Sequence, residues 1–146
     1  MELILSIIAV IISAISIIWS AGTHVQMLKR ERKQATLEAY NRLEAEALEP
    51  LDKFEPKQIR EISKNSRSEE YKTVSALIAR VEHFCVGVNE KIYDADVLYQ
   101  LAHGFLDGRI MSRIQPMIDS KQKNAEEMYF ENIEKVICDM KNRSKR

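Results

Sequence analysis

The chain opens with an unbroken apolar run and then continues as a charged sequence with helical spacing. From Leu3 to Ala21 there are 19 residues without a charge, rich in Ile, Leu and Val, and most of the run is apolar on every face of a helix. An α-helix of this length rises roughly 28 Å, which is close to the hydrocarbon thickness of a bilayer. The run therefore predicts a transmembrane helix, and residues 1–22 form the first segment of the chain.

The charges beside the run predict its orientation. No Lys or Arg precedes it, whereas Lys29, Arg30, Arg32 and Lys33 follow it closely. Lys and Arg near the end of a span are retained on the cytoplasmic side, so the N-terminus is expected outside and the rest of the chain in the cytoplasm. The four basic side chains are then membrane-surface residues, and the lipid bilayer is a partner. The alternative is a cleaved signal peptide, but the basic n-region is missing and Trp19 sits where an interfacial anchor would.

Apolar residues recur at spacings of three and four after the span, with no helix breaker before Pro50. This pattern predicts a juxtamembrane helical stalk over residues 23–49, continuous with the span, whose narrow apolar seam needs a partner. The spacing weakens over residues 50–67. There we expect a turn, a short helix near Pro56 to Ile62 and a polar loop.

Residues 68–141 predict a small helical bundle, and residues 142–146 a basic tail. Ser66 or Ser68 caps a second long helix that stops near Asn89, and Asp94 caps the next helix. The first of these helices presents one apolar stripe. Its members are Val74, Leu77, Ile78, Val81, Phe84, Cys85 and Val88.

The C-terminal part of the bundle contains helix breakers and a final amphipathic helix. Gly104, Gly108 and Pro116 predict a bent helix over 105–118, and Asn124 with Glu127 has the spacing of a capping box. The last helix presents a second apolar stripe. It consists of Tyr129, Phe130, Ile133, Val136, Ile137 and Met140. The predicted fold is all-α, with an N-terminal transmembrane helix that continues into a long stalk and is followed by the bundle.

Charge and reactive side chains narrow the possible functions. The chain has 22 Lys plus Arg against 22 Asp plus Glu, so no global field attracts nucleic acid and no nucleic-acid partner is expected. The two cysteines, Cys85 and Cys138, are expected to be packed free thiols of a reducing compartment. His83, Cys85 and His103 could be drawn as metal ligands, but His83 and Cys85 are two apart on a helix and diverge, so no metal is expected. No cofactor is expected either.

Small residues recur along the span at alternating steps of three and four. They are Ser6, Ala9, Ser13, Ser16, Ser20 and Thr23. Small faces allow helix backbones to approach in lipid, and this stripe predicts self-association into a homo-oligomer. The alternative is that each serine hydroxyl bonds to a carbonyl of its own helix.

One stretch of the bundle resembles a known family. The residues are Val81-Glu82-His83-Phe84-Cys85-Val86-Gly87-Val88-Asn89-Glu90-Lys91-Ile92-Tyr93-Asp94, then Val97-Leu98-Tyr99 and later Tyr129-Phe130-Glu131. They resemble an uncharacterised bacterial and prophage family of single-pass membrane proteins with a C-terminal helical domain of unknown function. The resemblance covers roughly the last two thirds of the chain and implies no activity. It places the protein in the inner, cytoplasmic membrane of a bacterium.

Several polar residues lie within or near these stretches. They are Glu82, Asp94, Arg109, Arg113 and Glu131. We interpret them as structural, with Arg80, Arg109 and Arg113 as candidate partners that keep the two glutamates ionised. The alternative is an enzyme with a carboxylate and arginine site, which lacks any accompanying nucleophile motif or phosphate-binding loop.

These observations favour a membrane-anchored helical interaction module that is not an enzyme and that binds itself or an unidentified protein partner. A second reading is a prophage-type defence or exclusion component that acts on the membrane through an oligomerised span. The span contains no ionisable residue that would suggest a charged pathway.

Overall fold

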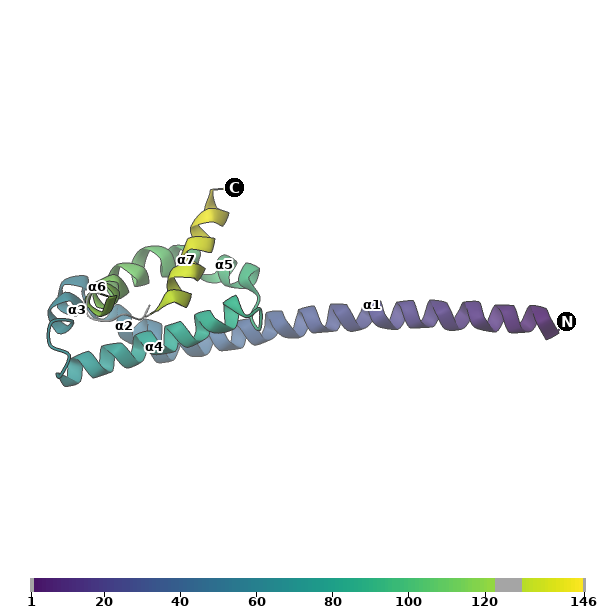
Figure 1. The fold of residues 1–146 in the computed structure, drawn as a ribbon, viewed down its shortest axis with the longest axis horizontal. Coiled ribbons are helices and arrows are strands. Elements are labelled where there is room, and N and C mark those ends of the chain that lie inside the picture. Colours follow the sequence, from purple (N-terminus) through teal and green to yellow (C-terminus); the bar gives the residue numbers. More distant parts are fainter. Residues whose placement is uncertain (1, 123–129, 146) are drawn as a thin grey trace.

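The fold is a long helix with a helical bundle built around one of its ends (Figure 1). The computed structural model describes residues 2–122 and 130–145, and this part of the chain is all-α, without strands. The first helix, α1, spans Glu2–Leu43, and its N-terminal half projects away from the bundle. The predicted fold class is confirmed.

Helix α1 does not end at a turn but continues through an irregular segment. A π-helical turn, η1 (Glu44–Leu48), is followed directly by α2 (Glu49–Asp52). The helical path therefore continues past Pro50, where a break was expected, and the proline lies at the start of α2, directly after the π-helical turn.

The next two helices have the predicted positions. Helix α3 spans Pro56–Ile62, and α4 spans Glu69–Asn89. The Ser68 hydroxyl caps α4 by accepting a hydrogen bond from the Tyr71 amide at 3.1 Å. The predicted short helix, the predicted cap and the stop near Asn89 are all confirmed.

The C-terminal helices pack across the others. Asp94 caps α5 (Ala95–Gly104) by accepting from the amides of Asp96 and Val97 at 3.0 and 3.1 Å. A π-helical turn, η2 (Phe105–Ile110), follows, and then α6 (Met111–Gln122), which contains Pro116. The irregularity expected after Gly104 thus takes the form of a π-helical turn. The last helix, α7, spans Glu131–Ser144.

The core forms where α1, α4 and the shorter helices meet. Helix α4 packs against both α1 and α7, α3 packs against α6, and α5 packs against α1. Among the described residues, the large apolar side chains that are fully enclosed come from seven elements. They are Leu48, Leu51, Ile59, Val74, Ile78, Leu98, Ile110, Ile114, Met117 and Ile118. The predicted stalk is therefore not free over its whole length, because from Thr36 onward its seam is covered by the bundle of the same chain.

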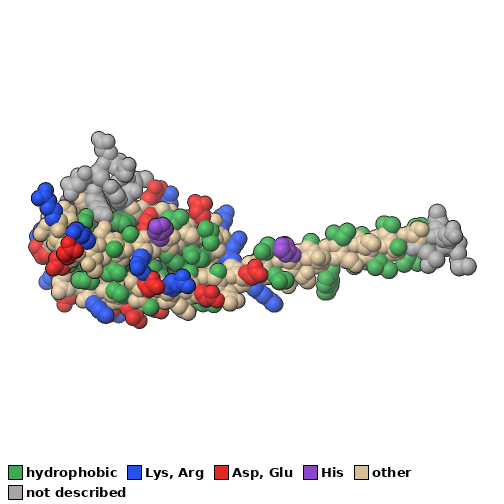
Figure 2. All heavy atoms as spheres, turned by 90° about the horizontal axis from the view of Figure 1, so that it is seen from below, with side chains coloured by type: hydrophobic (Ala, Val, Ile, Leu, Met, Phe, Trp, Pro, Cys, Tyr) green, Lys and Arg blue, Asp and Glu red, His purple; other side chains and the backbone are tan. Residues whose placement is uncertain are grey.

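The outer part of α1 is exposed at every residue from Ser6 to Ala35. Its apolar side chains include Ile17, Ile18 and Trp19, which are 69 to 75% exposed. Figure 2 shows hydrophobic side chains standing out around a thin rod, whereas most charged groups lie on the bundle. This helix is long and apolar enough to cross a membrane, and none of the apolar window found from Ser6 onward is buried in the molecule.

Some details differ from the sequence-based expectations. Cys85 is buried as expected, but Cys138 is exposed, because it lies on the side of α7 that turns away from α4. Phe130 does not belong to the last helix but precedes it with a left-handed φ of 67°. Tyr129 and the Asn124 and Glu127 capping pair lie outside the described residues.

Candidate functional site

A fully buried polar side chain lies where α1 enters the bundle. Thr36 is completely buried, and its hydroxyl donates to the Arg32 carbonyl at 2.7 Å. The same oxygen accepts a hydrogen bond from the Asp94 amide at 2.8 Å. Since Asp94 also caps α5, one residue ties α1 to the turn between α4 and α5 and orients the helix that follows.

Three aromatic rings pack beside this bond. Phe84 of α4 stacks on Tyr93 with ring centroids 5.0 Å apart, and Tyr40 of α1 meets Phe84 edge to face at 6.4 Å. Both geometries are favourable for aromatic pairs. We call Thr36, Tyr40, Phe84, Gly87, Tyr93 and Asp94 the junction.

Gly87 is the residue that lets the junction close. The amides of Ile92 and Tyr93 both donate to its carbonyl, at 2.9 and 3.0 Å. A Cβ at this position would lie 2.5 Å from the Tyr93 ring, which is closer than real side-chain atoms approach. The glycine therefore allows the turn to fold back onto α4, with Lys91 in a left-handed conformation at φ 59°.

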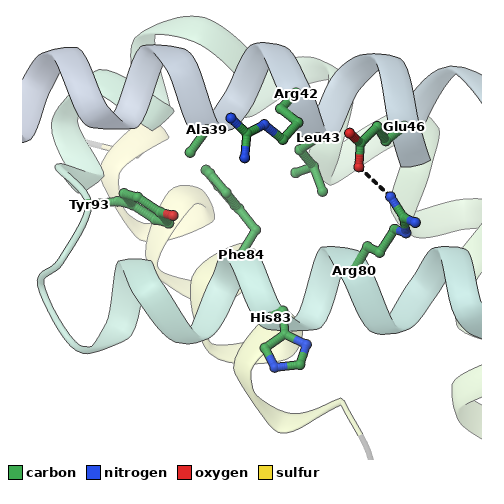
Figure 3. Close-up of a pocket in the computed structure, with 8 residues that line it drawn as sticks. All are labelled: Ala39, Arg42, Leu43, Glu46, Arg80, His83, Phe84 and Tyr93. Carbon is green, nitrogen blue, oxygen red and sulfur yellow. Dashed lines mark hydrogen bonds and ion pairs between the residues drawn. The ribbon is translucent and has the colours of Figure 1, made fainter.

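A groove of about 340 Å³ runs along the junction between α1 and α4 (Figure 3). Its apolar floor is formed by Ala39, Leu43, Phe84 and Tyr93, and its rim by four polar side chains. The polar members are Arg42, His83 and the ion pair of Arg80 with Glu46. Glu82, Asp94, Arg109 and Glu131 do not line it, so the groove does not bring together the carboxylates and arginines of the enzyme alternative.

Glu82 has a structural partner that the sequence did not indicate. Its two carboxylate oxygens accept hydrogen bonds from the amides of Asn132 and Ile133, at 3.1 and 3.0 Å, and from the Asn132 side chain at 2.7 Å. Helix α7 has no side-chain cap of its own, because Phe130 precedes it. Glu82 therefore caps α7 from α4, where a negative charge also suits the helix dipole.

The expected arginine partners of Glu82 and Glu131 are wrong. Glu131 pairs instead with Lys135, one turn further along α7. Arg80 pairs with Glu46, while Arg109 and Arg113 both reach Asp52. The carboxylates that these arginines do reach belong to η1 and α2, which pack against α4 and η2.

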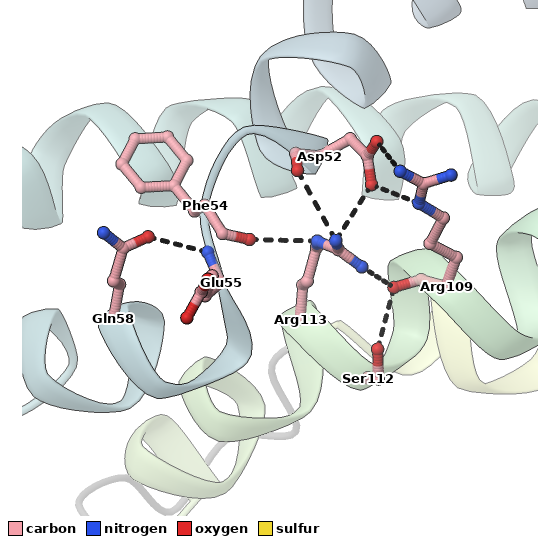
Figure 4. A network of polar contacts seen from close by, with 7 residues as sticks. All are labelled: Asp52, Phe54, Glu55, Gln58, Arg109, Ser112 and Arg113. Carbon is pink, nitrogen blue, oxygen red and sulfur yellow. Dashed lines mark hydrogen bonds and ion pairs between the residues drawn. The ribbon is translucent and has the colours of Figure 1, made fainter.

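Asp52 is the centre of a second polar cluster (Figure 4). Its carboxylate binds Arg109 through two nitrogens, at 2.7 and 2.6 Å, and one Arg113 nitrogen at 3.1 Å. Arg113 also donates to the carbonyls of Phe54 and Arg109, at 2.9 and 2.8 Å. This cluster fixes the turn after α2 against η2 and α6, so its chemistry is that of a structural clamp.

Burial changes the acidity of two groups. It raises the pKa of Tyr40 to about 12, with a smaller contribution from the negative charge of Glu44. Burial, together with the charge of Glu82, also raises the pKa of the Cys85 thiol well above its usual range. Cys85 is therefore a neutral packed thiol and not a reactive thiolate. Among the described residues no group of three or more His, Cys, Asp or Glu is placed to hold a metal ion.

The basic and small residues of α1 lie outside the bundle. Lys29, Arg30, Arg32 and Lys33 are all exposed, as are Ser6, Ala9 and Ser20. The hydroxyls of Ser13 and Ser16 donate to the carbonyls of Ala9 and Ile12, each at 2.9 Å. In this structure these two serines make the local bonds of the alternative interpretation.

Sequence reasoning missed Thr36, Gly87 and Asp52. Thr36 leaves a signal, because it occupies the apolar seam of the stalk at helical spacing from Tyr40 and Leu43. The roles of Gly87 and Asp52 depend on partners elsewhere in the chain, namely Tyr93 and the two arginines.

These features define an all-helical protein in which one long apolar helix is built into a small bundle. A family model described as a domain of unknown function (DUF4760) matches residues 3–140, and the chain belongs to this family. The match begins inside the apolar run, so it extends beyond the two thirds of the chain on which the resemblance rests. Bacterial or prophage origin stays a prediction. No curated protein and no solved structure matches the chain.

The first prediction concerns the close contact at Gly87. Gly87→Ala should lower the free energy of unfolding by about 1–3 kcal/mol, because the added methyl group overlaps the Tyr93 ring. The measurement is chemical unfolding of the full chain in detergent micelles, followed by circular dichroism. Gly108→Ala is the matched control, since nothing lies within 4 Å of its added Cβ. Equal stability of the two variants would contradict the assigned role of Gly87.

The second prediction separates the two glutamates. Glu82→Ala should cost about 1–3 kcal/mol, because it leaves the first amides of α7 without their acceptor. Glu131→Ala removes only an ion pair at the protein surface and should cost less than about 0.5 kcal/mol. Hydrogen exchange of α7 amides should accelerate in the first variant alone. An equal loss in both would show that Glu82 is not the cap.

The third prediction is a pH dependence. In the unfolded chain Tyr40 has the ordinary pKa of about 10, so the unfolded state loses this proton first as the pH rises. The stabilisation associated with neutral Tyr40 is complete below pH 10 and is lost progressively as the pH approaches 12. Between pH 9 and 11 the wild-type chain should lose more stability than Tyr40→Phe, measured by the same unfolding assay. Parallel pH profiles would refute the pKa shift.

Proposed function

We propose that this protein is a single-pass membrane protein whose helical bundle is an interaction module on the cytoplasmic side. One observation carries the proposal, namely that the same helix is apolar and exposed over its outer part, as described from Ser6, but enters the core from Thr36 onward. Soluble proteins rarely expose contiguous apolar patches of more than a few hundred Å². A lipid bilayer removes this cost, and the family match that begins at residue 3 makes the apolar helix part of the family pattern.

The order of residues along α1 supports the proposed orientation. Trp19 stands at the end of the apolar run, where an interfacial aromatic ring is favourable. The basic residues Lys29 to Lys33 follow and precede Thr36, the first residue enclosed by the bundle. In this arrangement the basic segment lies between the bilayer and the bundle, on the side where Lys and Arg are retained.

We also propose that the span associates with a second copy through its small residues. At about 100° per residue, Ser13, Ser16 and Ser20 lie roughly half a helical turn away from Thr36 and Leu43, which face the bundle. Two copies can therefore pair along this stripe, because each bundle lies on the side of its α1 that faces away from the other copy. Because the Ser13 and Ser16 hydroxyls are occupied locally, the association rests on close backbone packing.

An interaction role is preferred to an enzymatic one because the polar clusters already have structural roles. The clusters around Thr36, Glu82 and Asp52 each join two or more helices. Catalysis would need acid and base groups that line a cleft accessible to a substrate. The groove between α1 and α4 offers apolar area and a charged rim, which suits a binding surface.

The fourth prediction tests the membrane anchor and its orientation with a native probe. Cys138 is exposed on the bundle, whereas Cys85 is buried. The full chain should remain with the membrane after carbonate extraction, and a membrane-impermeant maleimide should label Cys138 only after the cells are permeabilised. Cys138→Ser is the control for labelling at Cys85. Labelling of intact spheroplasts, or release by carbonate, would overturn the proposal.

The fifth prediction tests self-association. In a Cys138→Ser background, Ser20→Cys should form a disulfide-linked dimer when membranes are oxidised, because it lies on the proposed contact face. Ile18→Cys, which lies on the opposite side of the same helix turn, should not. Adding Ser16→Leu to the Ser20→Cys chain should reduce the crosslink. Equal crosslinking at the two positions would show that the stripe is not an interface.

A further inference from the structure

The four basic residues that follow the span form one face of α1. At about 100° per residue, Arg32, Lys29, Lys33 and Arg30 cover an arc of roughly 160°, and Glu31 points to the opposite side. All four are exposed, and no hydrogen bond or ion pair of their side chains is found within residues 2–122 and 130–145. We call these four residues the basic face.

The basic face lies on the same side of α1 as the bundle. Thr36, Tyr40 and Leu43 are the first side chains of α1 to be buried, and their mean direction is within roughly 40° of the centre of the basic face. The helix is continuous from Lys29 to Leu43, so this relation is fixed by helical geometry. The basic face therefore occupies the space between the bundle and the end of the apolar run.

The basic face begins within side-chain reach of the lipid headgroups. Lys29 follows Ala21 by eight residues, which is roughly 12 Å along a helix, and its side chain is long enough to reach back toward the bilayer. Headgroup and interfacial layers extend several ångströms beyond the hydrocarbon on each side. Phosphate is therefore the anion most available to these side chains, and cations near an anionic membrane surface are attracted to it.

We propose that the basic face binds the phosphates of anionic lipids, so that these lipids collect beneath the bundle on one side of α1. This inference rests on the proposed membrane anchor. It adds the class of lipid that is bound and the side of α1 on which the lipid collects. The turn between α4 and α5 lies on the same side, because Asp94 bonds to Thr36. That turn carries the exposed Glu90 and Lys91 and the partly exposed Asp94, so it is not itself basic, and the basic face supplies the positive charge on this side.

The test uses Trp19, the only tryptophan in the chain, as a reporter. Trp19 lies at the end of the apolar run and within the arc of the basic face. The full chain is reconstituted in vesicles that contain a small fraction of brominated phosphatidylglycerol or the same fraction of brominated phosphatidylcholine, because bromine quenches nearby tryptophan fluorescence. At low salt the anionic lipid should quench Trp19 at least about twofold more, and the difference should shrink as salt screens the attraction.

Two variants with the same charge change provide the comparison. Replacing Lys29, Arg30, Arg32 and Lys33 by Gln should abolish the preference for the anionic lipid. Replacing Lys53, Lys57, Arg60 and Arg67 by Gln should leave it unchanged, because these exposed residues lie around α3, at the end of the bundle away from the projecting helix (Figure 1).

The possible results are distinct. Equal quenching by the two lipids, or a preference that survives loss of the basic face, would overturn the inference but leave the membrane anchor intact. Absence of quenching by either lipid would instead overturn the membrane anchor itself.

Discussion

The continuity of α1 is the constraint on which the rest of the structure depends. One unbroken helix from Glu2 to Leu43 carries an exposed apolar surface at one end and part of the bundle core at the other. The surroundings of the outer half of α1 therefore also determine the position and the orientation of the bundle, because the two parts share one helix. The directions of the basic residues and of the small residues relative to the bundle follow from the same helix.

The contacts at the junction explain why one stretch of the sequence is distinctive. Within residues 81–94, Glu82 caps α7, Gly87 admits the Tyr93 ring, and Asp94 joins α1 to α5. Each residue serves a different neighbour, yet together they connect α1, α4, α5 and α7 at one end of the bundle. Each of these three residues therefore has a structural role in joining the helices.

Features that depend on local physics were predictable from sequence. The long helix, the caps at Ser68 and Asp94 and the bounds of α3 and α4 follow from hydrophobic spacing and from cap residues. The ion pairs were not predictable, because a long arginine side chain can reach many positions, and the packing of the helices determines which carboxylate lies within its reach. Passage of the helix through Pro50 was also missed, since spacing alone does not reveal a π-helical turn.

A distance measurement in the membrane examines the continuity of α1 most directly. Spin labels at Ile11 and Gln34, both exposed, are placed in a full chain whose two cysteines are replaced and which is reconstituted in lipid nanodiscs. An unbroken helix over these 23 steps predicts a single narrow distribution near roughly 35 Å between the labelled positions. A broad distribution centred well below that distance would show a break between the apolar run and the bundle, and would contradict the model of one helix serving both.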